Sequence, residues 1–263
     1  MSLRVAVTGL GMFMPGFPNA TAWAEKNELP VDDPRKPGGL AFDRVNRRRA
    51  SQMGRAIGDC VAEAMASAGV DGQTTPVIVG SSIGEANAML GLLDKMWREH
   101  EPMSPAVFTV SVHNAASGLL SISMKNKGYT TSIAADYDTP AATLFEGLGL
   151  LATGTDAVVC VCADEASPRS LLEQAPHWDM LSAALVLQPE GAANALAHLT
   201  IDDCGDDREN ITIAPAELAV GFANSPQAGM MDLLDAIQRG ESGKLVLDRG
   251  TGRGYRVTLT SAR

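Results

Sequence analysis

A short polar turn in the middle of the sequence holds the side chains whose types and spacing best suit chemistry. Small and β-branched residues run from 128 to 135, and a polar group follows at once: Asp136, Tyr137, Asp138, Thr139 and Pro140. Thr139 before Pro140 favours a helix start, because a hydroxyl can cap the first turn and proline lacks an N–H that this turn cannot use. The positive end of the helix dipole would lower the pKa of a thiol at this turn, but the turn offers a phenol and two carboxylates.

The residues that follow complete a strand–turn–helix–strand unit. Leu144, Leu148 and Leu151 lie on one face of the predicted helix, and Gly154 ends that helix. The apolar run over 157–162 is typical of a buried parallel strand. An α/β architecture presents a reactive group at the turn between a strand and the helix that follows it. The turn over 136–140 is therefore the first candidate site.

The same patterns predict further elements on both sides of this unit. A strand over 4–10 is expected to turn at Gly9-Leu10-Gly11, and a helix within 42–69 starts at Phe42 or after Asn46 or Ala50. Three more strands are predicted over 76–82, 183–187 and 197–202, the last two paired with each other. The remaining elements are a helix to about residue 101, a helix after the His113-Asn114 turn, a helix bearing Met230, Leu233, Leu234 and Ile237, and a hairpin of 244–247 with 255–259.

Composition excludes several classes of function. The chain has 21 basic and 31 acidic residues, a net charge of −10, which argues against nucleic-acid binding. No apolar run reaches the roughly 18–20 residues of a membrane span, and the N-terminus enters a strand pattern directly, so we expect a cytoplasmic protein. No histidine or cysteine spacing suits a metal, and no glycine motif suits a dinucleotide or nucleotide, so we expect no cofactor. The four cysteines are expected to be reduced and structural: Cys60, Cys160, Cys162 and Cys204.

The order of these segments resembles the β-ketoacyl synthases of the thiolase-like superfamily. The resemblance is carried by the opening VTGLG, the helix MGRAIGDCVAEAMASAGVD, the Gly/Ser-rich turn after the second strand, and the whole of 128–166. It implies an α/β thiolase-like fold, with a mixed sheet flanked by helices. It also implies one complete half over 1–205 and a truncated second half over 206–263, a helix plus hairpin that packs on the same domain.

The resemblance also implies where the catalytic residues of the family would lie. Counting without a gap places the nucleophilic cysteine at Tyr137, and a slip of one residue places it at Asp136. Asp138 and His113 would be its neighbours, although His113 can equally serve as a hydrogen-bonding residue at a helix start. A phenol with a pKa of about 10 is a poor nucleophile at neutral pH. The two histidines of the family belong to its second half, and this sequence has none after His198.

Two functions are compatible with this pattern. The first is a catalytically inactive subunit of the chain-length-factor type, paired with an active ketoacyl synthase in polyketide, aryl-polyene or fatty-acid-type chain elongation, or with a second copy of itself. The alternative is an acyl-thioester enzyme with altered chemistry, a decarboxylase, acyltransferase or hydrolase that uses Tyr137 and His113.

A basic segment suggests a further partner. Four arginines cluster before the first long helix, and they could meet an acidic acyl carrier protein or simply face solvent: Arg44, Arg47, Arg48 and Arg49.

Overall fold

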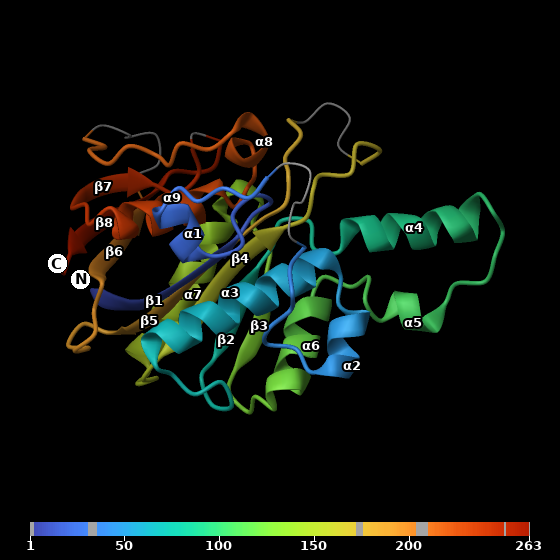
Figure 1. The fold of residues 1–263 in the computed structure, drawn as a ribbon, viewed down its shortest axis with the longest axis horizontal. Coiled ribbons are helices and arrows are strands. Elements are labelled where there is room, and N and C mark those ends of the chain that lie inside the picture. The colour runs from blue at the N-terminus through green and yellow to red at the C-terminus, as the bar shows by residue number, and fades with distance from the viewer. Residues whose placement is uncertain (1–2, 31–35, 172–175, 204–209, 250, 263) are drawn as a thin grey trace.

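A single mixed sheet of eight strands forms the centre of the molecule (Figure 1). The structure, a computed structural model, describes all residues except 1–2, 31–35, 172–175, 204–209, 250 and 263. The strand order is β3-β2-β4-β5-β1-β6-β8-β7. The strands are β1 (Val5–Phe13), β2 (Val77–Gly80), β3 (Thr130–Ile133), β4 (Val158–Asp164), β5 (Leu181–Pro189), β6 (Ala197–Asp203), β7 (Gly243–Val246) and β8 (Tyr255–Ser261).

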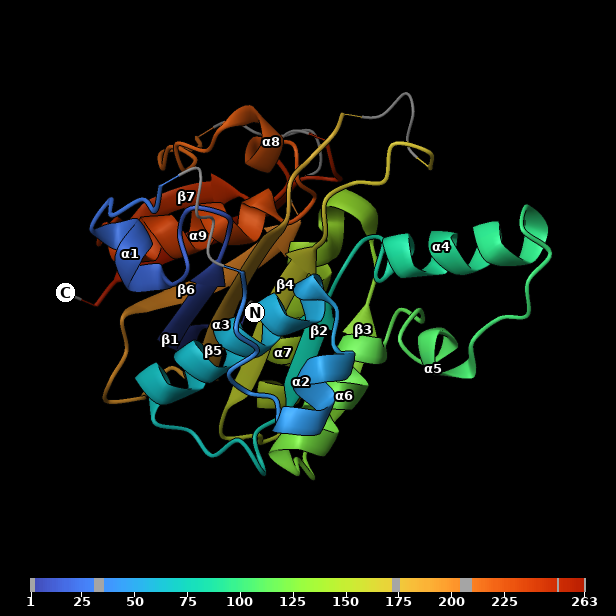
Figure 2. The same cartoon turned by 45° about the vertical axis from the view of Figure 1, so that its right-hand side comes forward.

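Helices cover both faces of this sheet. One apolar cluster joins the sheet to α3 and α6, and the other joins its opposite face to α7 and α9. By contrast, α4 and α5 project away from the body (Figures 1 and 2). The helices are α1 (Ala20–Ala24), α2 (Arg44–Arg49), α3 (Gln52–Ala68), α4 (Ala86–Trp97), α5 (Pro105–Phe108), α6 (Ala115–Met124), α7 (Thr139–Ala152), α8 (Val220–Ala223) and α9 (Ala228–Gln238), with a 3-10 turn η1 (Asp136–Asp138).

The predicted buried strand with alternating cysteines is confirmed. β4 runs parallel to β2, and every residue of β4 is buried. Cys160 and Cys162 point into one apolar cluster, whereas Val159 and Val161 point into the other. Cys60 is also a buried free thiol, and Cys204 lies outside the described residues. Burial raises the pKa of the thiols of Cys60 and Cys160, and raises that of Cys162 to about 12, so these three cysteines are structural.

The predicted turn at Gly9-Leu10-Gly11 is wrong. β1 continues through these residues to Phe13. A Cβ on Gly9 would collide with the backbone oxygen of Ala64, and one on Gly11 with that of Cys60. The two glycines therefore allow α3 to pack directly on β1. The glycine pattern indicates close packing of a helix on this strand and not a change of chain direction.

The helix predicted within 42–69 starts after Ala50, and a separate short helix, α2, precedes it. The Ser51 hydroxyl caps α3 by accepting a hydrogen bond from the N–H of Gly54 at 2.8 Å. The predicted stop at Gly69 is confirmed, because this residue takes a left-handed conformation with φ of 69°.

The predicted pairing of the strands over 183–187 and 197–202 is wrong. β1 lies between β5 and β6 and pairs antiparallel with both. β6 pairs on its other side with β8, which extends the sheet through the C-terminal hairpin. That hairpin is confirmed as an antiparallel pair of β7 and β8. The predicted apolar face of α9 is also confirmed, because Met230, Leu233, Leu234 and Ile237 are all buried.

The close approach of α3 and β1 gives a first test. We expect Gly11→Ala to lower the free energy of unfolding by about 1–3 kcal/mol, because the new methyl group would push α3 off the sheet. The matched control is Gly149→Ala on α7, where nothing lies within 4 Å of the added Cβ. That change should raise the stability by up to about 1 kcal/mol. Urea unfolding of both variants measures the difference, and equal effects would contradict the packing role of Gly11.

Candidate functional site

The candidate site is the turn between β3 and α7, where the predicted strand–turn–helix unit is present. Asp136, Tyr137 and Asp138 form η1, and α7 follows immediately. Asp136 has a φ of 50°, a left-handed conformation that is uncommon for a residue with a side chain. The turn therefore combines a sharp change of chain direction with the positive end of a 14-residue helix.

The predicted capping role of Thr139 is wrong. Its hydroxyl donates to the backbone oxygen of Asp136 at 2.7 Å and accepts from the N–H of Ala135 at 3.0 Å. The hydroxyl thus closes the turn on itself instead of satisfying the first N–H groups of α7. Because Asp136 is held in a left-handed conformation, its carbonyl turns back toward this hydroxyl, and the hydroxyl fixes the turn.

Tyr137 is half-buried and has no hydrogen-bond partner within the described part of the chain. Burial raises the pKa of its phenol, and the neighbouring carboxylate of Asp136 raises it further. Both effects disfavour the phenolate, so the environment makes Tyr137 a weaker nucleophile than a free tyrosine.

Asp138 attaches the C-terminal hairpin to the turn. Its carboxylate accepts the N–H of Arg253 at 2.9 Å. The backbone of Gly252 packs against the same carboxylate so closely that a Cβ there would collide with it. Asp138 does not cap α7 with its side chain, so its contacts are those of a residue that joins two distant segments.

His113 reaches the segment after β2 and shares no hydrogen bond with Tyr137 in the described part of the chain. Its Nε2 is 2.8 Å from the backbone oxygen of Ser81, and its ring packs against Gly84. The following residue, Ser82, donates from its hydroxyl to the backbone oxygen of Asp136 at 2.8 Å. His113 and the turn are therefore linked through two adjacent serines and share no direct hydrogen bond.

A buried polar network behind the turn was not predicted. Asp164, at the end of β4, is fully buried and accepts hydrogen bonds from the Ser81 hydroxyl at 2.6 Å and the Ser82 N–H at 3.0 Å. It also accepts one from the side-chain amide of Gln227 at 2.7 Å. Burial raises the pKa of this carboxyl, and the hydrogen bonds oppose that change. The sequence feature that could have predicted this network is an acidic residue at the end of a fully apolar strand, because a buried acid needs hydrogen-bond partners.

A second carboxyl is buried at the root of the projecting α4. Glu85 is 4% exposed, its Oε1 accepts the Ser51 hydroxyl at 2.8 Å, and its Oε2 has no partner among the described residues. Burial raises its pKa to about 7, with a smaller contribution from the nearby Glu165. A carboxyl with one unpaired buried oxygen favours its neutral form, so Glu85 is a structural acid of this helix start.

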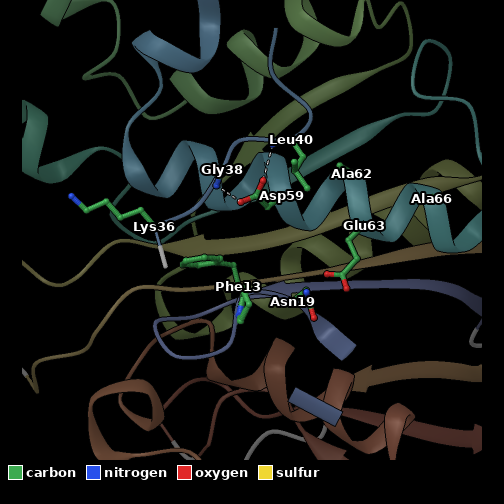
Figure 3. Close-up of a pocket in the computed structure, with 10 residues that line it drawn as sticks. Phe13, Asn19, Lys36, Gly38, Leu40, Asp59, Ala62, Glu63 and Ala66 are labelled. Atoms are coloured by element: carbon green, nitrogen blue, oxygen red, sulfur yellow. Dashed lines mark hydrogen bonds between the residues drawn. The ribbon is translucent and has the colours of Figure 1, made fainter. Parts of the chain in front are cut away.

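A cavity of about 490 Å³ lies away from the turn, between α3, the end of β1 and residues 36–40 (Figure 3). Its two carboxylates bind backbone: Asp59 accepts from Gly38 and Leu40, and Glu63 from Met12 and Ala20. None of its lining residues belongs to η1. Among the described residues, no three His, Cys, Asp or Glu side chains lie where they could hold a metal ion.

Comparison with known families identifies the class of protein. Residues 21–242 match the family model of the beta-ketoacyl synthase N-terminal domain. The chain therefore belongs to the β-ketoacyl synthase family. No curated protein gives a significant match.

Solved structures agree with this assignment at the level of the fold. The chain is similar to a chain of the ketosynthase ApeO in complex with its chain length factor ApeC from Xenorhabdus doucetiae, with a TM-score of 0.71, 21% identity, and 98% and 99% of the two chains covered. It is also similar to the ishigamide ketosynthase/chain length factor, with a TM-score of 0.66, 13% identity, and 97% and 98% covered.

A third similar structure is that of AntDE:AntF, a type II acyl-carrier protein in complex with its ketosynthase. Its TM-score is 0.57 at 18% identity, with 78% of this chain and 71% of that chain covered. The predicted thiolase-like fold, with a mixed sheet flanked by helices, is thus confirmed. No helix of the described residues has the length and apolar character needed to cross a membrane.

The buried acid at Glu85 predicts a pH dependence of stability. The ordinary pKa of a glutamate carboxyl is 4.5, and that of Glu85 in the folded protein is about 7. The stability that it contributes is therefore complete below about pH 4.5, falls as the pH rises from there, and is lost by about pH 7, with a total loss of about 3 kcal/mol. Glu85→Gln, which imitates the neutral acid, should remove this loss, and Glu99→Gln on an exposed site should not. Denaturant unfolding at pH 5 and pH 8 measures both, and an unchanged pH dependence in the Glu85 variant would refute the assignment.

The helix dipole at the turn predicts the behaviour of a thiol introduced there. In Tyr137→Cys, we expect a thiol pKa below the ordinary value of about 8.5, because Sγ would lie beside the backbone of the turn, where the positive end of α7 stabilises the thiolate. Burial and the Asp136 carboxylate raise the pKa of the phenol of Tyr137, whose oxygen lies at the far end of its ring, and the thiol tests whether the dipole outweighs them closer to the backbone. The pH profile of alkylation by iodoacetamide measures it, in a Cys204→Ser background that leaves only the three buried thiols. A pKa at or above the ordinary value would show that the turn no longer activates a nucleophile.

Proposed function

We propose that the chain is a subunit of the chain-length-factor type, without condensing activity of its own, that pairs with an active ketosynthase in polyketide, aryl-polyene or fatty-acid-type chain elongation. The observation that carries the proposal is the β3–α7 turn. Its left-handed residue and helix dipole are retained, while its side chains are two carboxylates and a phenol. A thioester exchange needs a thiolate at this position, and the three described cysteines are buried elsewhere.

An exposed apolar surface supports pairing with another chain. It covers the projecting α4–α5 region, where Trp97 is 77% exposed and Phe108 is 53% exposed. The other exposed apolar side chains between residues 86 and 112 are Met89, Leu93, Met103, Val107 and Val112. Several exposed apolar side chains on one projecting segment are typical of an interaction site. β3 also stands at the end of the sheet order, so one of its edges is open to a strand of a partner.

The architecture fits a shortened member of the family. We propose that residues 1–205 stand for its N-terminal half and that 206–263 are an abbreviated second half. In support, α9 packs in the same apolar cluster as α7, and β8 joins the sheet through β6.

The alternative of an enzyme that uses Tyr137 and His113 receives less support. The raised pKa of the phenol weakens it as a nucleophile, and His113 binds a backbone carbonyl instead of the phenol.

The pairing proposal is tested by co-expression with the ketosynthase of the same operon or gene cluster. We expect the two chains to co-purify, and we expect Trp97→Asp with Phe108→Asp to abolish this, because two charges would be buried in the interface. Val220→Asp is the matched control, since Val220 is 75% exposed on α8, away from the α4–α5 region. Size-exclusion chromatography measures whether the two chains elute together. Wild-type chains that fail to co-purify, or equal loss in the control, would contradict the proposal.

We further propose that α2 contacts an acidic acyl carrier protein. Its arginines are all exposed, but Arg47 also holds the preceding loop by donating to the backbone oxygens of Gly39 and Phe42. The test therefore replaces only Arg44, Arg48 and Arg49 by alanine. Carrier affinity should fall at least about tenfold at low salt, and the matched triple change of Lys95, Arg98 and Lys244 should leave it unchanged. Titration calorimetry distinguishes the two, and equal affinities would exclude α2 as the contact.

A further inference from the structure

A chain of hydrogen bonds connects the start of α9 to the candidate turn through Ser82, which lies 145 residues before Gln227 in the sequence. Gln227 is fully buried, and its side-chain Nε2 donates to Asp164 Oδ2 at 2.7 Å and to the Ser82 hydroxyl at 3.0 Å. The Ser82 hydroxyl then donates to the backbone oxygen of Asp136 at 2.8 Å. Asp136 is the residue of the turn that has the left-handed φ of 50°.

The direction of this series of hydrogen bonds follows from Asp164 acting as an acceptor. Its carboxyl oxygens accept the Ser81 hydroxyl and the backbone N–H groups of Ser82 and Ile83, so Gln227 presents its NH₂ group to them as well. The two protons of that group are then shared between Asp164 and Ser82, and Ser82 is left with its own proton for Asp136. This orientation has a cost, since Gln227 Oε1 is buried and has no partner among the described residues.

The backbone carbonyl of Asp136 is the group through which hydrogen bonds fix the turn. The backbone oxygen of Asp136 accepts two hydroxyls, one from Ser82 and one from Thr139. Thr139 belongs to the turn itself, whereas Ser82 comes from the end of β2. Of these two bonds, the Ser82 bond therefore fixes the turn relative to the sheet, and Gln227 controls which way the Ser82 hydroxyl points.

We infer that Gln227 is a positioning residue for the β3–α7 turn, acting through Ser82 on the backbone carbonyl of Asp136, with Asp164 as the acceptor that orients the amide. The C-terminal part of the chain thus sets the geometry of the site in the N-terminal part. The inference concerns this chain alone and does not need a partner. Its failure is therefore distinguishable from a failure of the proposed pairing.

The test uses the thiol of the Tyr137→Cys, Cys204→Ser protein as a reporter of the turn. Adding Gln227→Leu should reduce the alkylation rate by iodoacetamide at pH 7 about tenfold and move its pH profile upward, because the loss of both Gln227 hydrogen bonds frees the Ser82 hydroxyl and with it the turn. Gln238→Leu is the matched control. Gln238 lies at the other end of α9 and is also a glutamine whose Oε1 has no partner among the described residues, but its amide donates to the backbone oxygen of Ala20, away from the turn.

A second pair of variants changes only Ser82, the middle residue of this series of hydrogen bonds. These variants keep the inference testable if the Gln227 variant misfolds. Ser82→Ala should reproduce the slower alkylation, and Ser82→Thr, which keeps the hydroxyl, should restore the rate. Circular dichroism melting confirms that each variant is folded. Equal rates in the Gln227 and Gln238 variants, or in the two Ser82 variants, would overturn the inference.

Discussion

The structure around the candidate site depends on one buried carboxylate. Asp164 ends β4 with no solvent contact, and a charge in that place is stable only if hydrogen bonds replace its water. The partners come from the segment after β2 and from the start of α9. A single side chain therefore joins two parallel strands of the N-terminal part to a helix of the C-terminal part. Removing it would leave an amide, a hydroxyl and two backbone N–H groups without an acceptor.

This arrangement explains how the turn can keep its shape whichever side chain it presents. The backbone of the turn is held by hydroxyls and by the hairpin contact of Asp138 with Arg253, and none of these bonds uses the side chain of Tyr137. The shape is thus independent of the group that the turn presents. Under the proposed function, the nucleophile of the turn can therefore be replaced without loss of the fold.

Much of the fold could be predicted because its periodic elements have local causes. The apolar run of β4, the leucine face of α7 and the stop at Gly69 are each set by nearby residues. Gly9 and Gly11 misled prediction, because glycine marks both turns and close packing, and only the position of α3 decides between them. The pairing of β6 with β1 was likewise missed, since neighbours in sequence need not be neighbours in a sheet.

The turn itself was located from sequence, but the network behind it was not. Asp136, Tyr137 and Asp138 are consecutive, so their position followed from the strand and helix on either side. Gln227 lies 63 residues from Asp164 and sits at a helix start that resembles many others. Nothing local shows that its amide reaches β4. Long-range polar contacts of this kind depend on topology, and one of them decides what Asp138 binds.

The central claim is that this chain carries no acyl group while its partner does. Intact-protein mass spectrometry of the co-purified pair, after incubation with an acyl thioester, tests it most directly. The account predicts one acyl adduct, on the ketosynthase, and an unchanged mass for this chain. An adduct on this chain that disappears when Tyr137 is changed to Phe or Asp136 to Asn would contradict it.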